Sequence, residues 1–154
     1  MFKTHLMFSF LIGLLMIFFF NIGNKFLFLF FVLFFGALPD IDHYKSWIGR
    51  KLKVLSFLIN LFSKHRGIFH SIFPVLILYG VFLYYGLKEI ALASAIGYLS
   101  HLAMDSLTKT GINFLYPVSK FKIRGFIRTG GFLELVLLFF FLITSAYILK
   151  ILIF

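Results

Sequence analysis

The sequence predicts an all-α fold: a polytopic integral membrane bundle of about five transmembrane helices plus an amphipathic interfacial helix. Of the 154 residues, 62% are hydrophobic and 13% are charged, against roughly 45–50% and about 25% in soluble domains. Twenty-five phenylalanines are more than one core of this size can bury. Five apolar runs approach the length that crosses ~30 Å of hydrocarbon. We therefore expect residues 1–154 to form a single membrane-embedded domain.

The five expected spans cover residues 6–20, 26–38, 68–85, 90–104 and 132–154. The first span follows Lys3 and resembles a signal peptide, but no small-residue cleavage site follows Phe20, so we expect the span to be retained. The second span is short and ends at Pro39, so it needs Lys25 to snorkel to the membrane surface.

The interfacial helix is expected between the second and third spans. Apolar residues recur there at steps of three and four, with lysines near the start: Ile48, Leu52, Leu55, Ile59 and Phe62, with Lys45, Lys51 and Lys53. This pattern is typical of a helix in the headgroup plane that is attracted to anionic lipid. Because Val54, Phe57 and Leu58 widen the apolar face, a partly buried helix packing on the bundle is an equal alternative.

The basic residues predict the orientation of the chain. The net charge is +10, which in a soluble protein would point to nucleic acid, but membrane proteins concentrate Lys and Arg in cytoplasmic segments. Twelve of the fifteen basic residues lie at the N-terminus or in the 39–67 and 105–131 loops, and only Lys25, Lys88 and Lys150 lie on the other side. We expect a multi-pass protein of the cytoplasmic membrane with a cytoplasmic N-terminus, membrane lipid as its partner and no nucleic-acid partner.

The few histidines and acidic residues gather on the same side as the basic residues. All five histidines and four of the five acidic residues lie there: His5, His43, His65, His70 and His101, with Asp40, Asp42, Asp105 and Glu134. Ionisable groups at span ends are costly unless they are paired or bind a metal. Imidazole and carboxylate donors in a chain without cysteine favour Zn, with Mn or Fe as alternatives. We expect a divalent-metal site at the cytoplasmic interface, with enough donors for two or more ions.

The expected metal ligands come from several span ends. They are His5, Asp40, Asp42, His70, His101 and Asp105. His101 and Asp105 are four residues apart and share one helical face. Pro39 stops the second helix, which lets the carboxylates that follow it turn inward. The alternative is a purely structural role, which is stronger for His43 and His65 in their loops.

Asp42, Arg66 and Glu134 are the candidate catalytic residues. Arg66 could stabilise negative charge on a substrate or snorkel to lipid phosphate. Glu134 could bind metal or only favour a helix N-terminus. A divalent ion here would activate water against a phosphodiester or other ester, including a lipid-linked one. The alternatives are a non-catalytic metal-binding membrane protein and an ion transporter; the centres of the spans lack charged residues and histidine, which argues against transport.

Several sequence blocks resemble the family of membrane-bound, metal-dependent hydrolases, some of whose bacterial members are LexA-regulated inner-membrane proteins. The blocks follow His5 and are LPDIDH at 38–43, HRGIFHS at 65–71, GYLSHLAMDSLT at 97–108, Gly111 and Tyr116-Pro117. The resemblance implies an integral-membrane helical fold and a hydrolase activity. The ligand pattern is also similar to that of zinc-dependent phospholipase C, which implies zinc held by His and Asp and a phosphodiester substrate. The chain departs from that second pattern at Gly130, where a histidine four residues before Glu134 would be expected.

Overall fold

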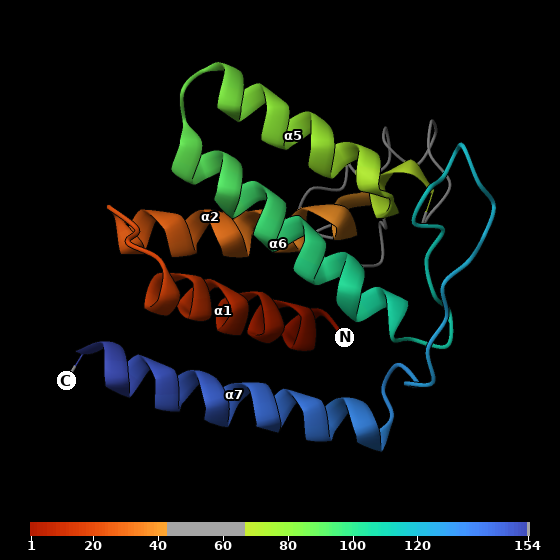
Figure 1. Ribbon diagram of the computed structural model, residues 1–154. Coiled ribbons are helices and arrows are strands. Elements are labelled where there is room, and N and C mark those ends of the chain that lie inside the picture. The colour runs from red at the N-terminus through yellow and green to blue at the C-terminus, as the bar shows by residue number, and fades with distance from the viewer. Residues whose placement is uncertain (43–66, 154) are drawn as a thin grey trace.

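The fold is built from five α-helices in a computed structural model that describes residues 1–42 and 67–153 (Figure 1). No β-strand occurs within these two ranges, so the predicted all-α class is confirmed. The elements are α1 (Phe2–Phe19), α2 (Lys25–Ala37), α5 (Ile72–Tyr84), α6 (Lys88–Ser106) and α7 (Phe132–Ile153), with short 3-10 helices η1 (Leu38–Asp42) and η2 (Ile68–His70).

Helix α6 lies at the centre of the bundle. It contacts α1, α2 and α5, whereas α7 lies on the outside and packs on α1. Successive helices alternate in direction, so the N-terminal ends of α1, α5 and α7 lie at the same end as the C-terminal ends of α2 and α6 (Figure 1). Both 3-10 helices and the 107–131 segment lie at this end. Helix ends that are far apart in the sequence therefore meet in one region.

Small residues bring α2 and α6 into backbone contact. A Cβ atom added to Gly97 would lie 2.2 Å from the Val32 carbonyl oxygen, so only glycine fits there. Close to this contact, the Ser9 and Ser100 hydroxyls form a hydrogen bond of 2.6 Å between α1 and α6. Interfaces of this kind are common among membrane helices, because small side chains let the backbones approach closely.

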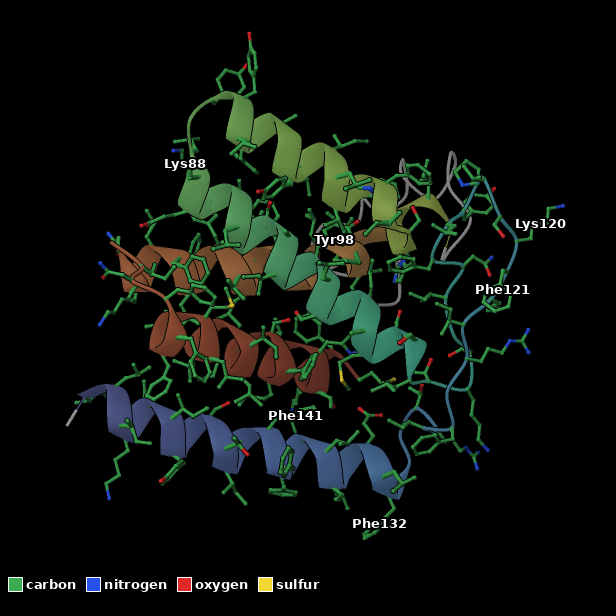
Figure 2. The ribbon with its side chains drawn as sticks, viewed as in Figure 1. Lys88, Tyr98, Lys120, Phe121, Phe132 and Phe141 are labelled. Atoms are coloured by element: carbon green, nitrogen blue, oxygen red, sulfur yellow. The ribbon has the colours of Figure 1, made fainter. Side chains whose placement is uncertain are left out.

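Large apolar side chains cover the outside of the bundle. Helix α7 packs on α1 through a cluster that includes Leu14, Phe141 and Ile148, and it exposes Phe140 and Ile143 on its other faces. Phe132 and Phe141 mark the outer and inner faces of this helix in Figure 2. Apolar exposure on this scale is expected where hydrocarbon, not water, surrounds the protein.

Two helices in the described part of the chain, Phe2–Phe19 and Phe132–Ile153, are long and apolar enough to cross a membrane, which is fewer than the five predicted. Helices α2 and α5 have 13 residues each, or about 20 Å of the ~30 Å of hydrocarbon. Helix α6 has 19 residues, but polar residues such as Glu89 and Asp105 lower its hydropathy. The expected interfacial helix lies outside the described residues.

Candidate metal centre

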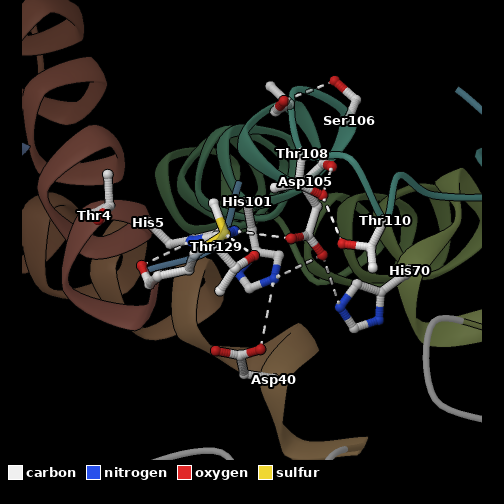
Figure 3. Close-up of polar contacts among 12 residues, drawn as sticks. Thr4, His5, Asp40, His70, His101, Asp105, Ser106, Thr108, Thr110 and Thr129 are labelled. Carbon is white, nitrogen blue, oxygen red and sulfur yellow. Dashed lines mark hydrogen bonds and ion pairs between the residues drawn. The ribbon is translucent and has the colours of Figure 1, made fainter. Parts of the chain in front are cut away.

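Five of the six predicted ligands come together where the helix ends meet (Figure 3). They come from four separate parts of the fold: His5 from α1, Asp40 from η1, His70 from η2, and His101 and Asp105 from α6. The three histidines and Asp105 are buried, whereas the Asp40 side chain is 21% exposed. The cluster is therefore enclosed by the bundle on most sides and is accessible beside Asp40.

Asp105 links the three imidazoles. Its Oδ1 lies 3.2 Å from His5 Nε2, and its Oδ2 lies 3.3 Å from His70 Nε2 and 3.9 Å from His101 Nε2. His101 Nε2 is also 3.9 Å from Asp40 Oδ1. Two ligands of one tetrahedral zinc ion, each bound at 2.0–2.1 Å, lie roughly 3.3 Å apart. The distances in the cluster are thus close to those that a shared ion requires.

Two overlapping ligand groups can be distinguished among the described residues. His5, His101 and Asp105 form one group, and Asp40, His70 and His101 form the other; within each, the ligand atoms lie within 4.8 Å of one another. The His101 ring is central, with its centroid 4.3 Å from that of His5 and 5.4 Å from that of His70. His101 therefore belongs to both groups.

The hydrogen bonds of the histidines fix which ring nitrogens carry protons. His101 Nδ1 donates to the Gly36 carbonyl at 2.8 Å, and His5 Nδ1 donates to the Met1 carbonyl at 2.9 Å. A carbonyl oxygen can only accept, so the lone pair of a neutral His101 ring is on Nε2. His5 differs, because its Nε2 also lies within hydrogen-bond distance, 3.2 Å, of the acceptor Asp105 Oδ1. Histidines that bind metals usually donate their other N–H in this way.

His101 Nε2 is a candidate donor to a cation. It is buried and has no hydrogen-bond partner within the described ranges. Its lone pair faces the carboxylate oxygens of Asp40 and Asp105, each at a distance too long for a hydrogen bond. Electron pairs that face one another in a buried site repel, and a shared cation would turn this repulsion into coordination. The donor set thus fits a divalent metal ion.

Neighbouring contacts position the ligand-bearing segments. Helix α2 ends at Ala37, and the chain continues through Pro39 into η1, which brings Asp40 toward α6. The Tyr98 hydroxyl donates to the Phe69 carbonyl at 2.8 Å and so ties η2 to α6. The buried Thr108 hydroxyl donates to the Asp105 carbonyl at 2.8 Å, at the C-terminal end of α6.

Glu134 lies beside the cluster but belongs to neither ligand group found in the described residues. One carboxylate oxygen accepts from the Thr4 hydroxyl at 2.9 Å and lies 2.7 Å from the Met1 ammonium nitrogen. The other accepts from the Gly130 N–H at 2.7 Å. Gly130 has a positive φ of 75°, which glycine tolerates best. These contacts match the structural alternative for Glu134, in which it stabilises the start of α7.

Other predicted residues lie wholly or partly beyond the described ranges. The backbone of Asp42 ends η1, but its side chain is outside the description, as are Arg66, His43 and His65. Sequence reasoning also missed one component, the Gly36 carbonyl that holds His101. Every residue has a main-chain carbonyl, so the sequence does not show which one will bind His101. The role of the Gly36 carbonyl depends on the close approach of α2 to α6.

The described helices and this cluster define a helical membrane protein with a buried histidine–aspartate cluster at one end of its bundle. The chain belongs to the YdjM inner membrane protein family, whose model matches residues 1–153. The predicted membrane location is thereby confirmed, as is the membrane-protein part of the resemblance seen in the sequence. The family description names neither a reaction nor a metal.

Two relatives support the family assignment. The chain is 36% identical over 115 residues to the uncharacterized protein YvsG of Bacillus subtilis, a match that covers 73% of this chain and 72% of that protein. It is 37% identical over 86 residues to the inner membrane protein YdjM of Escherichia coli. The latter match covers 52% of this chain and 44% of the relative, so it spans less than half of the Escherichia coli protein. No solved structure matches the chain.

Proposed function

We propose that this protein is a membrane-bound, metal-dependent hydrolase that acts on a phosphodiester or other ester. The observation that carries this proposal is the convergence of His5, His101 and Asp105 with a buried, unpartnered Nε2 atom on His101. Nitrogen and oxygen donors without thiolates suit Zn, with Mn and Fe as alternatives. When bound, a divalent ion in such a site lowers the pKa of a coordinated water and polarises the oxygen of an ester or phosphoryl group.

The residues of the chain divide between holding the ion and orienting its ligands. His5, His70 and His101 would each offer Nε2, and Asp105 would offer a carboxylate oxygen. The Gly36 carbonyl keeps the His101 proton on Nδ1, which leaves Nε2 free to coordinate. This arrangement fixes the ring before any ion arrives, so little reorganisation is needed on binding.

Asp40 marks the side from which a substrate would approach. Its side chain is 21% exposed, whereas that of Asp105 is 4% exposed. Asp40 Oδ1 faces His101 Nε2 and can therefore contact both the ion and an entering group. Asp42 and Arg66 remain predicted catalytic residues close to this side in the sequence, with Arg66 available to stabilise negative charge on a substrate.

The site is proposed to open at the cytoplasmic surface of the membrane. The support is the distribution of basic residues, since Lys109, Lys120, Arg124 and Arg128 all follow α6 at the end that carries the cluster. In Figure 2, Lys120 lies at this end and Lys88 at the opposite end. A reporter that is active only in the cytosol, fused after residue 154, should be inactive. An active C-terminal fusion would refute this orientation.

The decisive experiment measures metal content and hydrolysis together. The wild-type protein and a His101→Ala/Asp105→Ala variant are purified in detergent, and bound Zn, Mn and Fe are quantified by mass spectrometry. Hydrolysis of phosphodiester, phosphomonoester and carboxylic ester substrates is measured after chelation and after metal is added back. Glu89→Gln is the control, because Glu89 lies at the far end of α6 and accepts from the Gly23 N–H.

We expect the wild type and Glu89→Gln to retain metal and metal-dependent hydrolysis, and the double variant to lose both. If the double variant retains wild-type metal content, the assignment of the centre is wrong. If metal binds but no substrate is hydrolysed under any metal condition, the protein is a non-catalytic metal-binding membrane protein instead. Metal-dependent flux into proteoliposomes would favour the transporter alternative.

A further inference from the structure

An apolar groove lies next to the metal centre, between η1, η2, α5 and α6. It has a volume of about 310 Å³, within the range of sites that bind small molecules. All of the described residues that line it are hydrophobic or aromatic: Leu38, Ile68, Phe69, Phe73, Pro74, Ile77, Leu78 and Tyr98. The only hydroxyl among them, on Tyr98, donates to the Phe69 carbonyl.

Several residues that line the groove are close in the sequence to ligands of the centre. Phe69 directly precedes His70, and Leu38 lies two residues before Asp40. Tyr98 lies one helical turn before His101 on α6. Because η1, η2 and α6 each carry both a lining residue and a ligand, a molecule in the groove would lie beside the segments that hold the imidazoles and carboxylates.

We propose that this groove binds the hydrocarbon chain of an amphiphilic substrate whose ester or phosphodiester head lies at the metal centre. This inference rests on the proposed function, which it extends by naming the substrate class. Hydrolysis of a lipid at a membrane surface requires the scissile bond to be held still beside the reacting groups. A groove that fixes the chain beside the head would provide this orientation.

The surroundings of the groove favour a lipid chain over a protein partner. The family is one of membrane proteins, so acyl chains are the medium beside the exposed apolar side chains of α5. Ile77 is 63% exposed at the groove edge, and its neighbour Leu76 is 58% exposed. The groove volume of about 310 Å³ is that of a site for one small molecule, whereas a stable protein interface buries at least ~1,000 Å² in total.

The test uses a matched pair of substitutions on adjacent residues of α5. Ile77 lines the groove, whereas Leu76 is similarly exposed but is not among the lining residues. Ile77→Trp should fill the groove edge, and Leu76→Trp places the same bulk outside it. Both proteins are reconstituted into phosphatidylcholine nanodiscs after treatment with chelator. Dodecanol that carries a photoactivatable diazirine in its chain is then cross-linked, and the labelled peptides are mapped by mass spectrometry; its uncharged head is not repelled by the carboxylates of a centre without metal.

We expect this alcohol to label residues 68–78 in the wild type and in Leu76→Trp. Overfilling a packed site commonly costs enough free energy to weaken binding about fivefold or more, so labelling in Ile77→Trp should fall by at least about that factor. Equal labelling of the two variants would show that the probe contacts ordinary surrounding lipid, and the proposal would be overturned. If either tryptophan variant does not fold, Ile77→Phe and Leu76→Phe form the replacement pair.

This readout separates the groove from the hydrolase activity. Because the cross-linking uses protein without metal and a probe that is not hydrolysed, it does not depend on turnover. Selective loss of labelling in Ile77→Trp would support the groove even if no hydrolysis were found, and the proposed reaction alone would then be wrong. Hydrolysis of short-chain and long-chain esters at equal rates by both variants would overturn the assignment of the groove to the substrate.

Discussion

Substitution of Gly97 by alanine tests whether the contact between α2 and α6 sets the metal affinity. Gly97 lies on α6 one turn before His101, and Gly36 on α2 provides the carbonyl that accepts from His101 Nδ1. A Cβ atom at Gly97 would lie 2.2 Å from the Val32 carbonyl oxygen and 2.9 Å from the Gly36 nitrogen. These are backbone atoms, which cannot rotate away as a side chain can.

The expected displacement follows from these distances. Carbon and oxygen atoms that are not bonded approach to about 3.3–3.6 Å, so α2 and α6 must separate by about 1 Å. The 2.8 Å hydrogen bond from His101 Nδ1 to the Gly36 carbonyl would then exceed the usual limit of about 3.2 Å. Loss of a hydrogen bond that orients a metal-binding histidine typically lowers metal affinity about 10–100-fold. We expect a loss in this range for Gly97→Ala.

The assay is a competition titration of Zn against a chromophoric chelator, in detergent, with size-exclusion chromatography and circular dichroism as measures of folding. Gly80→Ala is the control, because a Cβ atom at Gly80 on α5 would meet no atom of the described residues within 4 Å. This variant should bind Zn as the wild type does. If Gly97→Ala is folded and binds Zn with wild-type affinity, then the Gly36 carbonyl does not control the His101 ring and the reasoning is refuted.

Three further predictions concern the surroundings of the centre. Glu134→Gln should leave the metal content unchanged while it lowers the melting temperature, because the carboxylate contacts to Thr4 and Gly130 are weakened; a loss of metal would instead make Glu134 a ligand. Chelation should lower the melting temperature of the metal-loaded wild type, since an ion at 100 times its Kd contributes about 2.7 kcal/mol, and it should have no effect on His101→Ala/Asp105→Ala. Thr108→Val should cost about 1 kcal/mol in chemical unfolding, through loss of the hydrogen bond to the Asp105 carbonyl; an unchanged unfolding midpoint would mean that another group replaces it.

The positions of the helices could be predicted from local sequence features such as prolines and apolar runs. Pro39 predicted the end of the second helix, and α2 does end at Ala37 before η1 begins. The apolar run that begins at residue 132 predicted α7, which is one of two helices in the described residues that are long and apolar enough to cross a membrane. The number of crossings was harder to predict, because α5 and the part of α2 that follows Lys25 are apolar, yet each helix has only 13 residues.

The candidate centre was predictable where side chains carry the chemistry and not where the backbone does. The i, i+4 spacing of His101 and Asp105 placed them on one face of α6, and His101 Nε2 lies 3.9 Å from Asp105 Oδ2. The partner of His101 Nδ1 is a main-chain carbonyl of α2, and no residue type in the sequence indicates such a partner. The sequence could not show that Glu134 accepts a hydrogen bond from Thr4, because the two residues are 130 positions apart. They come into contact only because α7 packs on α1.

His101 belongs to both ligand groups, and this limits how two ions could bind at the same time. Its Nδ1 is committed to the Gly36 carbonyl, so only Nε2 remains, and one nitrogen lone pair coordinates one ion at a time. The two ligand groups therefore compete for the same donor. An ion that occupies the position beside His5 withdraws His101 from the position beside His70, so filling one position weakens the other.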